Sequence, residues 1–64
     1  MTEPDAIAKL RHDLANPLAA LLAETQLMLL SETPLPDEVR TGLQEIEKLA
    51  IRMRTILRDT KSAA

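Results

Sequence analysis

One stretch of this chain decides its fold, and it reads Leu43-Gln44-Glu45-Ile46-Glu47-Lys48-Leu49-Ala50-Ile51-Arg52-Met53-Arg54-Thr55-Ile56-Leu57. Apolar residues recur in it at alternating spacings of three and four, at Ile46, Leu49, Met53 and Ile56. This spacing places them on one face of an α-helix. Three further residues widen that face: Leu43, Ala50 and Leu57. The sequence therefore predicts an amphipathic helix over about residues 37–60.

The N-terminal half carries a seven-residue apolar repeat, at Ile7, Leu14, Leu21 and Met28, which predicts a helix over about residues 4–30. Pro17 lies inside it. Proline lacks the N–H that would bond the carbonyl of Asp13, and its ring crowds that carbonyl. A break into two short helices is one outcome. We expect a bent, continuous helix, because the apolar repeat keeps its phase across the proline.

Residues 31–36 hold two of the four prolines and form the turn between the helices. Because this connection is short, the helices should be antiparallel neighbours. A chain of 64 residues without cysteine is near the lower limit for folding alone, yet 45% of it is hydrophobic. We therefore expect one all-α domain over residues 1–64, an antiparallel helical hairpin that forms a homodimeric four-helix bundle.

Some residues fit this pattern less simply. Gly42 falls on the apolar face and should permit a close approach between helices. Three leucines lie outside the seven-residue repeat: Leu22, Leu29 and Leu30. They could form a docking patch, but we expect them to enlarge the core of the bundle. Positive charges at Arg52, Arg54 and Arg58 suit the C-terminal end of a helix dipole.

Composition excludes several classes of function. The net charge is −2 and no aromatic residue is present, so the chain lacks the basic and stacking surfaces of nucleic-acid-binding proteins. Its apolar runs are too short to span a bilayer, and no signal peptide precedes them. One histidine and no cysteine argue against a metal site. We expect a cytoplasmic domain, whose parent protein could still be membrane-anchored.

The chemical motif is His12-Asp13-Leu14-Ala15-Asn16-Pro17-Leu18. With Leu14 in the apolar repeat, His12 falls on the outer side of the helix, and Asn16 follows it by one turn on the same side. A single exposed histidine usually has no role. An acid, an amide and a proline at fixed spacings beside it favour a functional one.

This motif resembles the H-box of the dimerisation and histidine-phosphotransfer domain of bacterial sensor histidine kinases. That motif reads His, Glu or Asp, two variable residues, Thr or Asn, then Pro. Residues 43–57 also resemble the second helix of that family, so the resemblance covers nearly the whole chain. The chain departs from it at Ala15, where many members carry Arg or Lys, and at Arg11, where a small residue is common.

The resemblance implies the role of each motif residue. His12 would be the phosphoacceptor nucleophile, because a neutral imidazole attacks phosphorus well near neutral pH. Asp13 would be the general base that stabilises the positively charged ring or accepts its proton. Asn16 would contact the phosphoryl group or support dephosphorylation of the partner. The face of the helix that carries His12, with its alanines, would admit a docking protein at Ala15, Ala19, Ala23 and Gln26.

The partners follow from what the chain lacks. It has no Gly-rich nucleotide loop and no acidic Mg²⁺ site, so we expect no cofactor in it and no phosphorylation from ATP by the chain alone. ATP and Mg²⁺ would come with a kinase catalytic domain, and a response-regulator receiver domain would accept the phosphoryl group on an aspartate. One alternative is a purely structural helical dimerisation module. A weaker alternative is a monopartite histidine phosphotransfer protein. The histidine of that family usually has Lys and Gly as neighbours, and His12 does not.

Overall fold

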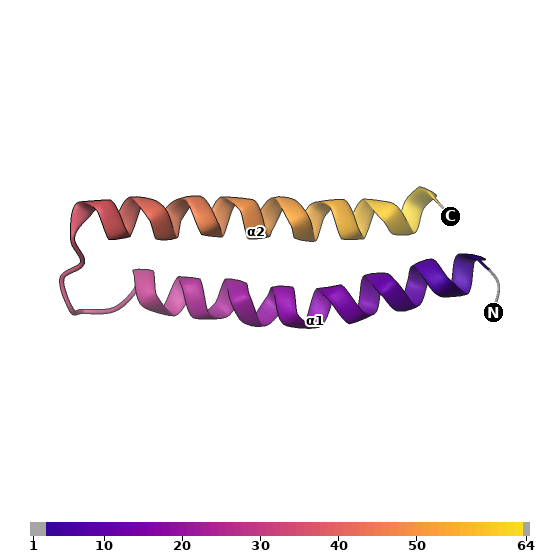
Figure 1. Ribbon diagram of the computed structural model, residues 1–64, viewed down its shortest axis with the longest axis horizontal. Coiled ribbons are helices and arrows are strands. Elements are labelled where there is room, and N and C mark those ends of the chain that lie inside the picture. Colours follow the sequence, from indigo (N-terminus) through magenta and orange to yellow (C-terminus); the bar gives the residue numbers. More distant parts are fainter. Residues whose placement is uncertain (1–2, 64) are drawn as a thin grey trace.

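Two long helices make up the protein. The computed structural model describes the backbone of residues 3–63 and the side chains of residues 5–60. Helix α1 (Glu3–Leu29) and helix α2 (Asp37–Ala63) are joined by residues 30–36 and lie antiparallel, side by side (Figure 1). They form a rod of 49 × 15 × 12 Å. The described part contains no strand, and the all-α helical hairpin is confirmed.

Helix α1 passes through Pro17 without a break. Figure 1 shows a change of direction near the middle of α1, where the proline removes one backbone hydrogen bond. The bent, continuous helix is therefore confirmed over the alternative of two short ones. Because the helix is continuous, side chains before and after the bend lie on one connected surface.

Helix α2 begins directly after Pro36, whose carbonyl accepts a hydrogen bond from Arg40 N–H at 3.0 Å. Asp37 and Glu38 occupy its first turn, where the positive end of the helix dipole stabilises carboxylates. The helix continues to Ala63, past the end expected near residue 60. Residues 61–63 contain neither glycine nor proline, so nothing in the local sequence ends it sooner.

The hairpin is held by a narrow strip of side chains: Leu18, Leu22 and Thr25 of α1, and Leu43 and Ala50 of α2, with Leu57 packed against them. The Thr25 hydroxyl is satisfied because it donates to the Leu21 carbonyl at 2.8 Å. The three residues expected only to widen the apolar face of the second helix are thus the ones that contact α1. Leu22 lies in the core as expected and Leu29 is half-buried, whereas Leu30 is 80% exposed at the start of the turn.

The residues of the seven-residue repeat do not form this strip. Leu14, Leu21 and Met28 are 45%, 50% and 47% exposed. A helix that packs against two neighbouring helices needs two apolar strips. The seven-residue repeat forms the strip of α1 that the hairpin leaves uncovered. Gly42 belongs with that second strip. A Cβ added there would meet nothing within 4 Å, so the close approach expected at Gly42 is not made inside the hairpin.

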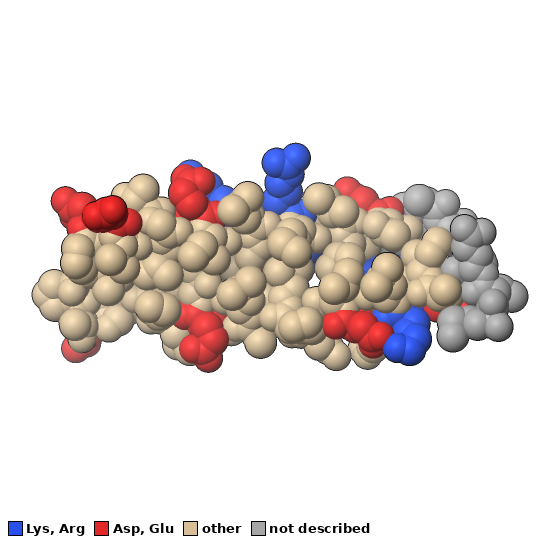
Figure 2. All heavy atoms as spheres, viewed as in Figure 1, with Lys and Arg blue, Asp and Glu red and all other residues tan. Residues whose placement is uncertain are grey.

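A large apolar surface therefore remains exposed. Twelve large apolar side chains of the described part are exposed, among them Leu14, Leu21, Met53 and Ile56. Figure 2 shows a broad uncharged surface over both helices, with charged side chains along its two edges. A groove of about 320 Å³ runs through it, lined by Leu14, Pro17, Leu18, Leu21, Met53, Ile56 and Leu57. Neither helix is long and apolar enough over its described residues to cross a membrane.

Candidate functional site

His12 lies on the exposed surface of α1, five residues before the proline at the bend. Among the described residues, its imidazole has no hydrogen bond and no ion pair. It borders a groove of about 570 Å³ between α1 and α2. The ring nitrogens are thus available to a group that enters this groove.

Small side chains make one wall of this groove, which we call the His12 groove. From α1 it is lined by Arg11, His12, Ala15, Leu18, Ala19, Leu22, Ala23 and Gln26, and from α2 by Arg54, Leu57 and Arg58. The four residues expected to receive a docking protein all line it. They fall on one side of α1 because they are spaced by three or four residues. Alanine methyl groups leave room there for the backbone of another protein.

Asp13 does not line the His12 groove. Its Oδ2 accepts a hydrogen bond from Lys9 Nζ, one turn earlier in α1. Adjacent residues of a helix project about 100° apart, so the Asp13 carboxylate and the His12 ring leave the helix in different directions. In this structure no hydrogen bond joins the Asp13 carboxylate to the His12 ring.

Asn16 is exposed one turn beyond His12 and also lies outside the lining of the groove. Its amide has no hydrogen-bond partner among the described residues. Pro17 faces the other, apolar groove. The structure thus brings His12 together with the docking residues, and it leaves Asp13 and Asn16 at the edge of that surface.

The two grooves lie on opposite sides of the hairpin. Leu18 and Leu57 line both, because they fill the space between the helices and separate one groove from the other. One side offers only apolar residues, and the other offers His12 with alanines and arginines. A partner that covers the apolar side leaves the His12 groove open.

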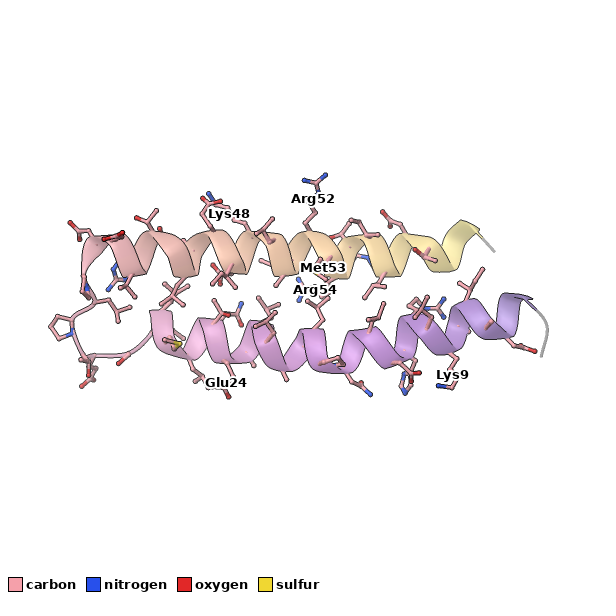
Figure 3. All side chains as sticks on the ribbon, in the orientation of Figure 1. Lys9, Glu24, Lys48, Arg52, Met53 and Arg54 are labelled. Atoms are coloured by element: carbon pink, nitrogen blue, oxygen red, sulfur yellow. The ribbon has the colours of Figure 1, made fainter. Side chains whose placement is uncertain are left out.

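The sequence interpretation missed three residues of the groove: Arg11, Arg54 and Arg58. We expected the arginines of the second helix to serve its C-terminal dipole, but α2 extends nine residues beyond Arg54. In Figure 3, Arg54 lies between the two ribbons, whereas Arg52 and Lys48 extend from the outer side of α2. The spacing of four residues between Arg54 and Arg58, with Leu57 beside them, is the signal that places both on the side of α1.

The model of the His Kinase A (phospho-acceptor) domain matches residues 5–63, nearly the whole chain. The chain belongs to this family. Neither the curated proteins nor the solved structures gave a significant match.

Membership of the His Kinase A family accounts for the exposed apolar side. The chain is a phosphoacceptor and dimerisation domain of a histidine kinase, and its hairpin pairs with a second copy as a homodimeric four-helix bundle. We expect the uncovered strip that includes Leu14, Leu21, Met53 and Ile56 to form the dimer interface. The domain works with a kinase catalytic domain. The residues described contain no group of three or more His, Cys, Asp or Glu side chains that could hold a metal ion.

Proposed function

We propose that His12 is the residue that is phosphorylated in this domain, and that it passes the phosphoryl group to an aspartate of a response-regulator receiver domain. One observation carries the proposal. The chain contains a single histidine, which has no hydrogen bond or ion pair among the described residues and lies exposed beside an open groove in a domain of a phosphoacceptor family.

The first step uses the lone pair of His12 Nε2. It forms a bond to the γ-phosphorus of ATP held by the catalytic domain, and the bond from that phosphorus to the bridging oxygen breaks, so that ADP leaves. The imidazole then carries a positive charge, and the proton on Nδ1 passes to a carboxylate. Asp13 is the nearest acid in the sequence, and it reaches the ring once it leaves Lys9.

The second step reverses the chemistry at the ring. A carboxylate oxygen of the receiver aspartate bonds to the phosphorus, the nitrogen–phosphorus bond breaks, and Nδ1 regains its proton. The wall formed by Ala15, Ala19 and Ala23 lets the receiver approach closely enough for this transfer. Asn16, a turn from His12, would contact the phosphoryl group or a water molecule that hydrolyses the receiver phosphoaspartate.

ATP and Mg²⁺ enter this scheme only with the catalytic domain. The residues of this chain bind neither in the proposal; they supply the nucleophile, the base and the docking surface. We place the reaction in the cytoplasm, where ATP is available.

The test is phosphorylation of the chain by a histidine-kinase catalytic domain with ATP and Mg²⁺. We expect an acid-labile, base-stable label that is absent in His12→Gln. That variant should retain the helical circular dichroism signal, because an exposed side chain contributes little to packing. Added receiver domain should remove the label from the wild-type chain. Label that persists in His12→Gln would refute the proposal, and a chain that is never labelled would support the purely structural module.

A further inference from the structure

The His12 groove carries a concentration of positive charge that phosphotransfer by His12 alone does not explain. Among the described residues its lining includes Arg11, Arg54 and Arg58 and no acidic side chain, although the chain as a whole has a net charge of −2. None of the three guanidinium groups has a hydrogen bond or an ion pair within the described part of the chain. Each therefore keeps its full set of donors for a ligand.

The three arginines come from the halves of the two helices that run alongside each other. Arg11 precedes His12 in the N-terminal half of α1, and Arg54 and Arg58 lie in the C-terminal half of α2. Because the helices are antiparallel, these two halves lie alongside each other (Figure 1). The part of α1 that lines the groove farthest from His12 in the sequence, at Ala23 and Gln26, contributes no charged side chain.

We propose that Arg54 and Arg58, assisted by Arg11, form an anion site that binds the phosphoryl group while it is attached to His12. A phosphoryl group carries a charge of about −1.5 to −2 near neutral pH and presents three acceptor oxygens. Guanidinium groups bind such oxygens with two parallel hydrogen bonds, and they keep their charge at any ordinary pH. The site holds the group above the alanine wall, facing the side from which a partner enters.

This inference rests on the proposed function only in that His12 bears the phosphoryl group. Loading of His12 does not require a kinase, because phosphoramidate transfers its phosphoryl group to a histidine nitrogen and releases its amino group as ammonia. The anion site can therefore be tested on the dimeric domain by itself. A failure of enzymatic phosphorylation would count against the proposed function and leave this test unaffected.

The measurement is the ³¹P chemical shift of chemically phosphorylated protein as a function of pH. Nearby cations favour the dianion of the phosphoryl group, so removing them should raise the midpoint of this titration. We expect a rise of about half a pH unit in the double variant Arg54→Gln/Arg58→Gln, a modest value because both side chains are exposed to water. The double variant Arg54→Lys/Arg58→Lys keeps the charge and should restore most of the wild-type midpoint.

Arg52→Gln is the matched control, because Arg52 is on the same helix but extends from its outer side (Figure 3). It should leave the midpoint unchanged. Circular dichroism and light scattering should show that all variants remain helical dimers. An unchanged midpoint in the Gln double variant, or an equal rise in Arg52→Gln, would overturn the proposal.

A titration with inorganic phosphate distinguishes a site for the phosphoryl group attached to His12 from a site for a free anion. It should bind the unphosphorylated domain only weakly, since the covalent link to His12 supplies most of the local concentration. If inorganic phosphate perturbs the Arg54 and Arg58 Nε–H signals while phosphorylation of His12 does not, the site belongs to a free anion and the proposal is wrong.

Discussion

Lys9 Nζ donates a hydrogen bond to Asp13 Oδ2 across one turn of α1. The acid next to His12 is thereby held by a cation rather than by the imidazole. Both side chains are well exposed, at 65% for Lys9 and 53% for Asp13, and an exposed pair at this spacing stabilises a helix only slightly. The carboxylate can therefore leave Lys9 at little cost when the His12 ring becomes positively charged.

Replacing Lys9 with Gln should make Asp13 more available and raise the rate of His12 phosphorylation about twofold, in line with the small free energy of such a pair. The initial rate of labelling from ATP measures this. Lys48→Gln is the control, because it removes a similar exposed pair, with Glu45 at 3.3 Å, from the second helix. A slower rate in Lys9→Gln would mean that Lys9 itself assists the reaction.

Asp13 and Asn16 should have separable roles. As a general base, Asp13 should contribute about 10²-fold, so Asp13→Asn should slow phosphorylation of His12 by about that factor. Asn16→Ala should leave this rate largely intact and slow the loss of phosphate from a bound receiver. Rates of labelling and of receiver dephosphorylation, measured side by side, separate the two.

Pro17→Ala is the control for that comparison, because a change at Asn16 could also alter the neighbouring bend of α1. If Asp13→Asn and Asn16→Ala gave the same defect in both assays, the proposed division between them would be wrong.

Met53→Asp should dissociate the dimer and unfold the chain. The Met53 side chain lines the apolar groove of the dimer side, and an unpaired carboxylate in such an interface costs several kcal/mol. Light scattering should report 2 × 7.1 = 14.2 kDa for the wild-type chain and a smaller mass with loss of helicity for the variant. If Met53→Asp still formed a helical dimer, the apolar side would not be the dimer interface.

Ala19→Asp, unlike Met53→Asp, should leave the dimer intact and impair phosphotransfer. Ala19 lines the His12 groove and is exposed, so the carboxylate stays in water and the dimer should persist. The added side chain and charge should obstruct the receiver and slow phosphotransfer from His12 by about tenfold or more, an estimate based on the loss of one close interface contact. Transfer at the wild-type rate would exclude this wall as the docking surface.

Gly42→Ala should raise the thermal unfolding midpoint. Alanine favours a helix interior by about 1 kcal/mol over glycine, and the added Cβ meets nothing within 4 Å in the hairpin. Circular dichroism melting at fixed protein concentration measures the effect. A lower midpoint would indicate that the second copy approaches α2 closely at this position.

The sequence by itself determined the two helices and the turn, and it singled out His12 as the candidate nucleophile. Apolar spacing predicted both helices, the proline-containing turn separated them, and the unbroken phase across Pro17 predicted a bend in place of a break. The motif around His12 led to the family that the comparison then established. These features are local, because they depend on the order of residues along one helix or one turn.

Only the tertiary structure decided which strip of each helix packs where. Periodicity shows that a helix has an apolar face, but the rotation of each helix about its axis and the offset between the two decide which residues meet. That is why Leu43 and Ala50 are buried and Leu57 packs against the core, while Met53 remains exposed. It is also why Arg54 and Arg58, more than forty residues from His12 in the sequence, share a groove with it. No pattern within a single helix contains that relationship, because it arises from the antiparallel packing of two.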